Sequence, residues 1–266
     1  MISRAVLQRL ANREKVALGV LEKDYVLTEV LKALSRTDSL RDLLVFKGGT
    51  ALRKIYFADW RYSEDLDFTS RHDVSKDELR QRLDEWYLQV EQASQIRLLT
   101  KMLHKPNGYA RVRAQFIGPL AYPGMIFMDF SFDEPLCLEP VAREILADPF
   151  SSEGEKVLAY PLEEVLAEKI RSLLERGKSR DYYDVWRILK EKPTGLNFAL
   201  LFDVLDKKLK HKNLTATSVD DFLPKDLNSL KKYWESELGT QIQLLPELDV
   251  VIEELREMLN VIIHGV

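Results

Sequence analysis

The stretch V-F-K-G-G-T-A-L-R-K-I-Y at 45–56, followed by R-Y-S-E-D-L-D-F at 61–68, decides the fold. The first part predicts the end of an apolar strand, a tight glycine turn at 48–50 and a short helix behind it. The second part predicts another strand. Because side chains alternate along a strand, Asp65 and Asp67 point to one side and the apolar residues point to the core. Two carboxylates are therefore aimed at one spot.

These residue types suit phosphate and metal chemistry. Backbone N–H groups at a helix start can approach a triphosphate closely where glycines carry no side chain. Two metal ions roughly 3.5–4 Å apart need hard oxygen ligands, which paired aspartates supply. The candidate nucleotide-binding residues are Gly48, Gly49, Thr50 and Ser63, and the candidate metal ligands and catalytic acids are Asp65 and Asp67. A D-x-D pattern alone is common on surfaces, so the prediction depends on the whole combination.

This combination resembles the AbiEii family of nucleotidyltransferase toxins, which share the G-G-T-A-L turn and an S-x-D-x-D-F strand. The segment L-E-K-D-Y-V-L-T-E-V-L at 21–31 is also similar to the family. The resemblance implies the α+β polymerase β-like nucleotidyltransferase fold, a small mixed sheet of four to six strands flanked by helices, with a helical C-terminal region. Asp24 in that segment is better interpreted as part of a solvated charge run than as a site residue.

Composition limits the class of protein. The chain has 266 residues, 45% of them hydrophobic and 31% charged, as expected for an ordinary globular protein. The lone Cys137 excludes an internal disulfide and a cysteine zinc cluster, which fits a cytoplasmic location. We find no signal peptide and no membrane-spanning run. With a net charge of −4, a nucleic acid would have to be held by a local basic patch.

Three strand-like runs, 96–104, 109–117 and 124–132, follow a helix predicted over 76–93. The middle run alternates, with apolar residues on one face and Tyr109, Arg111, Arg113 and Gln115 on the other. Arginines beside an aromatic side chain can hold phosphates and stack a base, and so Tyr109, Arg111 and Arg113 are candidate nucleic-acid contacts. An exposed sheet face would show the same pattern.

The third run contains an aspartate within apolar surroundings. Asp129 lies between Phe127 and Ser131, opposite a face of apolar side chains. A carboxylate in such a strand is costly to bury unless it is paired or binds a metal. In polymerase β-like enzymes the third carboxylate comes from a strand beside the D-x-D strand, and Asp129 fits that position. Shared metal ions would bring it within roughly 8 Å of Asp65 and Asp67.

The sequence divides into a nucleotidyltransferase domain at 1–150 and a helical domain at 151–266, with a boundary at 146–160 where periodicity breaks. Lys169 lies on the inner stripe of a helix predicted over 161–176. It either extends past the stripe to water or binds a triphosphate as a point charge.

The resemblance adds roles in this second domain. The family has an E-K-I-x-A-L helix followed by K-x-R-D-x-x-D, which E-K-I-R-S-L-L and K-S-R-D-Y-Y-D match. It implies that Lys169 is the family lysine and that Asp184 or Asp181 is the helical aspartate, acting as base for the acceptor hydroxyl. Farther on, Lys207, Lys208 and Lys210 either contact a phosphate backbone or form a solvated helix end.

The resemblance implies a magnesium- or manganese-dependent nucleotidyltransferase toxin that transfers a nucleoside monophosphate from an NTP to an acceptor. In the family the acceptor is the 3′ end of tRNA, whose extension blocks aminoacylation, and the expected partner is an antitoxin, either a protein or a phosphorylating kinase. The alternatives are a nucleotidyltransferase acting on a small aminoglycoside-like molecule or on a protein, and an NTP-binding module without turnover.

Overall fold

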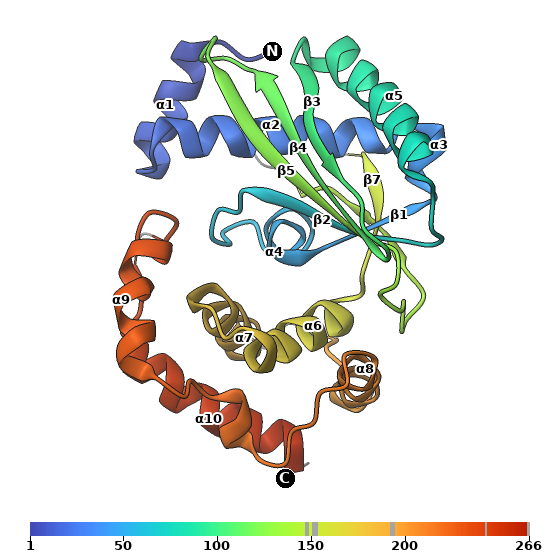
Figure 1. Cartoon of the computed structure of the whole chain (residues 1–266). Coiled ribbons are helices and arrows are strands. Elements are labelled where there is room, and N and C mark those ends of the chain that lie inside the picture. The colour runs from blue at the N-terminus through green and yellow to red at the C-terminus, as the bar shows by residue number, and fades with distance from the viewer. Residues whose placement is uncertain (147–148, 151–153, 192–194, 243, 265–266) are drawn as a thin grey trace. The chain divides into compact units, whose positions relative to one another are not determined.

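A computed structural model describes residues 1–146, 149–150, 154–191, 195–242 and 244–264 (Figure 1). The chain divides into two compact units. Unit 1 consists of Met1–Leu136 with Pro140–Ala159, and unit 2 consists of Cys137–Glu139 with Tyr160–Val266. Part of the predicted boundary, residues 147–148 and 151–153, lies outside the described residues.

Unit 1 is built around a mixed sheet. Its described elements are α1 (Arg4–Glu14), α2 (Leu18–Leu34), α3 (Asp38–Arg41), β1 (Leu44–Lys47), α4 (Gly48–Ala51), the π-helix η1 (Leu52–Tyr56), β2 (Asp65–Ser70), α5 (Lys76–Ser94), β3 (Arg97–His104), β4 (Tyr109–Ile117), β5 (Pro123–Ser131), β6 (Val141–Glu144) and β7 (Lys156–Ala159). The strand order is β3-β4-β5-β2-β1-β7-β6. The D-x-D strand β2 lies in the middle, parallel to β5 and antiparallel to β1.

The α+β fold is confirmed, with one correction to its extent. Six strands fall within residues 1–150, but β7 comes from 156–159, a segment that the sequence assigns to the helical region. It pairs parallel with β1 at Phe46 and Ala159, and antiparallel with β6. A strand of four residues is too short to show a periodicity of its own, and one of its two partners, β1, lies more than 100 residues away.

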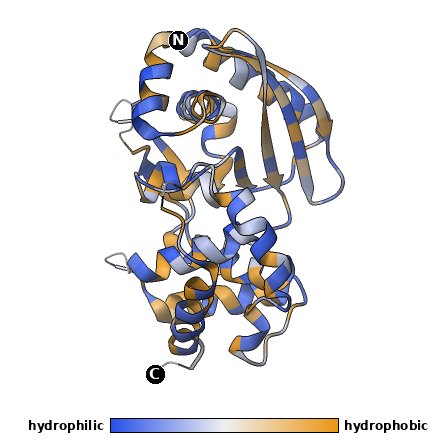
Figure 2. Ribbon diagram, turned by 90° about the vertical axis from the view of Figure 1, so that its left-hand side faces the viewer, coloured by the Kyte–Doolittle hydropathy of each residue, from blue (hydrophilic) through white to orange (hydrophobic). Residues whose placement is uncertain are grey.

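Local sequence features explain why α5 and β4 form. Ser75 accepts a hydrogen bond from the backbone N–H of Glu78 and so caps α5, the helix predicted over 76–93. Along β4, side chains alternate between buried and accessible as its sequence predicts. Figure 2 shows hydrophilic and hydrophobic residues alternating along the strands of the sheet.

One face of the sheet packs against α2 and α5. Phe68, on the side of β2 opposite the aspartates, contacts Trp86 of α5 edge-on at 5.9 Å and stacks on Phe130 of β5 at 5.6 Å. The indole N–H of Trp86 donates to the carbonyl of Val30 in α2 at 2.9 Å. Burial of this face therefore fixes the register of β2 and directs its acids to the other side.

Unit 2 is helical in its described part. Its elements are α6 (Leu162–Glu175), α7 (Ser179–Glu191), α8 (Phe198–His211), the 3₁₀-helix η2 (Val219–Phe222), α9 (Leu227–Leu238) and α10 (Leu248–His264). Gly177, at a φ of 50°, follows the end of α6, the helix predicted over 161–176. Among the described residues, no helix is long and apolar enough to cross a membrane.

Candidate active site

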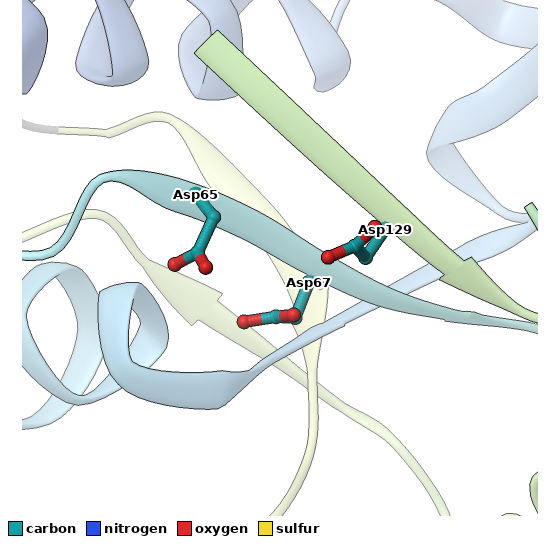
Figure 3. A group of neighbouring side chains, drawn as sticks. All are labelled: Asp65, Asp67 and Asp129. Carbon is teal, nitrogen blue, oxygen red and sulfur yellow. The ribbon is translucent and has the colours of Figure 1, made fainter. Parts of the chain in front are cut away.

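Three aspartates of unit 1 converge at the centre of the sheet (Figure 3). Asp65, Asp67 and Asp129 each offer a carboxylate oxygen, and these atoms all lie within 4.8 Å of one another. The predicted proximity of Asp129 to the D-x-D pair is therefore confirmed. All three side chains are partly accessible, so a substrate can reach them from solvent.

Sheet register explains this convergence. Asp67 pairs with Asp129 across the parallel β2–β5 ladder, so their side chains lie on the same face of neighbouring strands. Asp65 lies two residues earlier on β2 and points the same way. Leu66, Met128 and Phe130, on the opposite face, are fully buried. The apolar residues thus fix the direction in which the carboxylates point.

The glycine turn contacts both aspartates of β2. Gly48 has a φ of 79°, and a Cβ placed on it would lie 2.2 Å from the Oδ2 of Asp67. The Ser63 hydroxyl donates to the Oδ1 of Asp65 at 3.1 Å, and the Thr50 hydroxyl donates to the carbonyl oxygen of Asp65. The structure therefore brings the predicted nucleotide-binding residues to the carboxylates.

The helix after β1 differs from its predicted form. It begins at Gly48 rather than Ala51, and after one turn it widens into the π-helix η1. The glycines are thus part of the first helical turn. Gly49 lies against the side chain of Arg61, which sequence reasoning missed: a Cβ there would lie 3.0 Å from the guanidinium Nη2. The only available signal was a basic residue just before the S-E-D-L-D segment.

Asp129 is held by two side chains of β4. The Tyr109 hydroxyl donates to its Oδ1, and the Arg111 Nε lies 3.5 Å from the same oxygen. Burial raises the pKa of Asp129 and so does the charge of Asp65, whereas Tyr109 and Arg111 act in the opposite direction. Burial, followed by the bond to Asp129, also raises the pKa of Tyr109, so this phenol stays a donor at neutral pH.

The donor set of the triad fits a divalent cation. Three carboxylates supply hard oxygen ligands, which Mg²⁺ and Mn²⁺ prefer, and their spacing lets one ion contact all of them. No cysteine or histidine belongs to this cluster, which disfavours a soft metal. The candidate ligands are thus Asp65, Asp67 and Asp129.

Lys169 of unit 2 does not extend to water. Its ammonium lies 2.8 Å from Asp184 Oδ2 and 3.7 Å from Asp181 Oδ1, and the side chain is 9% exposed. Both aspartates are fully buried. Asp181 also accepts two hydrogen bonds from Arg176, at 2.8 and 2.9 Å. Burial opposes ionisation of Asp181, yet Arg176 and Lys169 together lower its pKa below the ordinary value.

The prediction that the lysines at 207–210 contact a phosphate backbone is wrong for Lys208. Lys208 is fully buried, with its ammonium 2.8 Å from Glu164 and 3.2 Å from Glu168, so it cannot contact a phosphate backbone. Lys207 and Lys210 remain exposed, and Lys210 pairs with Asp206. The two glutamates that pair with the buried Lys208 lie on α6, about 40 residues earlier in the chain. The sequence around Lys208 therefore does not indicate them.

Asp24 also differs from its predicted solvated state. It is 2% exposed and lies 2.9 Å from the Lys54 ammonium and 3.3 Å from the Arg53 Nε. Arg53 lies over the ring of Tyr62 and donates to the carbonyl of Trp60. Asp24 thus links α2 to η1, and through Arg53 to the loop before β2.

A cavity of about 660 Å³ lies within unit 2. It is bounded by the end of α6, the start of α7, the 214–226 segment and α9. None of Asp65, Asp67, Asp129 or Lys169 lines it. We therefore base the functional assignment on the carboxylates.

A glycine turn, a D-x-D strand and a third aspartate on the neighbouring strand together define a nucleotidyltransferase. The family model described as "Nucleotidyl transferase AbiEii toxin, Type IV TA system" matches residues 30–261. The chain belongs to this family, which makes it a toxin-type nucleotidyltransferase.

Solved structures agree in fold. MenT4, a nucleotidyltransferase toxin from Mycobacterium tuberculosis H37Rv, is similar over 99% of this chain and 90% of its own, with a TM-score of 0.74 and 17% identity. A crystal structure from H. pylori described as a "putative nucleotidyltransferase" is similar over 92% of this chain and 95% of its own, with a TM-score of 0.58 and 18% identity. A comparison with curated proteins finds no match.

Proposed function

We propose that the protein transfers a nucleoside monophosphate from an NTP to a hydroxyl at the 3′ end of an RNA, with tRNA as the acceptor. The observation that carries the proposal is the convergence of three carboxylate oxygens within 4.8 Å beside a glycine turn. The blocked tRNA would no longer be aminoacylated, which accounts for toxicity and for the need of an antitoxin, either a protein or a kinase.

The acceptor oxygen attacks the α-phosphorus, the bond from that phosphorus to the bridging α–β oxygen breaks, and pyrophosphate leaves. A divalent ion, Mg²⁺ or Mn²⁺, held by the triad supplies charge neutralisation for the phosphates and the leaving group. The N–H groups near Gly48 and Gly49 bind phosphate oxygens, and Ser63 keeps the Asp65 carboxylate oriented through its hydrogen bond.

The roles in unit 2 rest on the family motif. The motif assigns the role of base for the acceptor hydroxyl to Asp184 or Asp181, and this role requires the acceptor to reach a carboxylate that is fully buried near Lys169 in this structure. Lys169 lies 2.8 Å from Asp184 and 3.7 Å from Asp181, and we assign to it the family role of binding the triphosphate as a point charge.

Purified protein incubated with each labelled NTP, Mg²⁺ and total RNA tests the proposal. We expect label to enter tRNA, and Asp67→Ala to lower the rate about 100-fold or more while leaving the fold intact. Glu64→Ala is the matched control, because this exposed acid lies one residue before Asp65 and outside the triad. Label that enters only a small hydroxylated compound or a protein, or NTP binding without turnover, would refute the RNA acceptor.

A further inference from the structure

Two rows of side chains cross the sheet from the carboxylates to its edge. Residues paired across a ladder share a face, and the ladders β2–β5, β5–β4 and β4–β3 connect one residue of each strand in turn. One row is Asp67, Asp129, Arg111 and His104; the other is Asp65, Phe127, Arg113 and Met102. Each row begins at a triad acid, continues to an arginine and ends on the edge strand β3.

This face of β3 and β4 is open. Met102 is 40% exposed and Leu99, farther along β3, is 57% exposed, although both are large and apolar. Arg113 is exposed, and its side chain has no ion-pair or hydrogen-bond partner among the described residues. The helices α2 and α5 pack on the opposite face, as the contact of Trp86 with Phe68 shows.

The two outer strands, β3 and β4, contain basic residues and no acidic ones. Neither R-L-L-T-K-M-L-H at 97–104 nor Y-A-R-V-R-A-Q-F-I at 109–117 contains an acidic residue, although the chain as a whole has a net charge of −4. The guanidinium carbon of Arg111 lies over the ring of Phe127, 4.9 Å from the ring centroid. A cation and an aromatic face therefore lie together beside Asp129. Cations interleaved with flat and apolar side chains suit a single-stranded nucleic acid, whose phosphates and bases they contact respectively.

We infer that the open face of β5, β4 and β3 binds the single-stranded 3′ end of the acceptor RNA, with the terminal nucleotide near Phe127 and Asp129. The preceding nucleotides pass Arg111 and Arg113 and reach Met102 and His104. The inference rests on the proposed function, which it extends from the triad to the edge of the sheet.

The width of the face sets the length of RNA that it binds. Neighbouring strands lie about 4.8 Å apart, so β5 and β3 are separated by about 10 Å. Stacked nucleotides rise about 3.4 Å each, so about three of them span this distance. A paired 3′ end cannot present its bases to a sheet face, because they are stacked inside the helix.

Fluorescence anisotropy with labelled RNA hairpins, without NTP, tests the inference on the full chain. The probes carry 3′ overhangs of zero, one, three and five nucleotides. We expect affinity to rise at least tenfold from the blunt hairpin to the three-nucleotide overhang and then to level off. Met102→Glu should remove this gain. Leu88→Glu is its matched control, because Leu88 is 52% exposed but lies on α5, which packs on the covered face.

Salt dependence separates phosphate contacts from stacking. Arg113→Gln should make the slope of log K against log salt shallower by about 0.7, the value for one phosphate of a single strand. Arg80→Gln, on α5, removes an exposed arginine from the covered side and should leave the slope unchanged.

Affinity that is independent of the overhang, or equal effects of Met102→Glu and Leu88→Glu, would overturn the inference. If β3 instead pairs with another copy of the chain, the protein would be a dimer in gel filtration that Met102→Glu makes monomeric, and this would also overturn it. The proposed function is tested by a separate experiment, the transfer of label from NTP to RNA. Transfer to RNA with unchanged binding in the β3 variants contradicts only the inference, and overhang-dependent binding without transfer contradicts only the proposed function.

Discussion

At the scale of single residues, a substitution at Gly48 tests how closely the glycine turn must approach Asp67. A Cβ at this position would lie 2.2 Å from the Asp67 Oδ2, and the φ of 79° disfavours any side chain. We expect Gly48→Ala to displace the Asp67 carboxylate and to lower both metal affinity, measured by calorimetry, and the rate of nucleotide transfer. The backbone conformation alone should cost about 1–2 kcal/mol of stability.

Gly19→Ala is the control for this change. Gly19 lies in α2, and no atom lies within 4 Å of the added Cβ. Alanine there should leave transfer unchanged and stabilise the fold by about 0.5–1 kcal/mol. A Gly48→Ala protein as active as Gly19→Ala would show that Asp67 does not need the space.

The lowered pKa of Asp181 predicts how the stability of the fold depends on pH. Its folded-state pKa lies below the ordinary value of 3.8, and therefore its ion pairs stabilise the fold fully above about pH 4. This contribution is lost as pH falls through the lower, folded-state pKa. We expect Asp181→Asn to cost about 3 kcal/mol at pH 7, as for a broken buried ion pair. In urea unfolding, the difference between wild type and variant should shrink below pH 4, and a constant difference would contradict the assigned ion pairs.

At the scale of elements, η1 depends on a buried ion pair. Lys54 of η1 is 1% exposed and lies 2.9 Å from Asp24 of α2. We expect Asp24→Leu to destabilise the protein by about 3–5 kcal/mol, because it leaves the buried ammonium without this carboxylate. Adding Lys54→Leu should recover much of that loss. Stability of the four proteins by chemical denaturation gives the coupling energy, and simply additive losses would show that the pair is not coupled.

The same elements show what the sequence can predict. In β2 and β4, burial on one face gives a period of two, and so the directions of Asp65, Asp67, Arg111 and Arg113 follow from their neighbours alone. Asp129 is identified in the same way, as a charge within an apolar strand. These predictions succeed because the decisive interactions lie within a few residues along the chain.

Other features depend on partners that are distant in sequence. Lys208 and Asp24 have the sequence signature of solvated charges, yet each is buried because opposite charges about 30 to 40 residues away meet it. The strand β7 exists through pairing with β1 and β6 rather than through its own pattern. Gly48, where the helix starts, lies beside Asp67, and Gly49 lies beside Arg61; only the folded sheet brings these side chains to the turn.

At the scale of the whole molecule, each unit has its own reporters of unfolding. Trp60 and Trp86 are buried in unit 1, and Trp186 and Trp234 are buried in unit 2. Replacing one pair by phenylalanine leaves fluorescence that reports on the other unit alone. The triad lies entirely in unit 1, so a ligand of the triad acts directly on the stability of that unit.

We expect Mg²⁺ at about 100 times its dissociation constant to raise the free energy of unfolding of unit 1 by about 2.7 kcal/mol, because it binds the folded carboxylates and not the unfolded chain. The readout is thermal unfolding of the Trp186→Phe, Trp234→Phe protein with and without the ion. Asp65→Asn with Asp67→Asn should abolish the shift. The complementary protein, Trp60→Phe with Trp86→Phe, shifts by the same amount only if both units unfold as one cooperative structure. A shift that persists in the double asparagine variant would place the ion elsewhere and contradict the triad as its site.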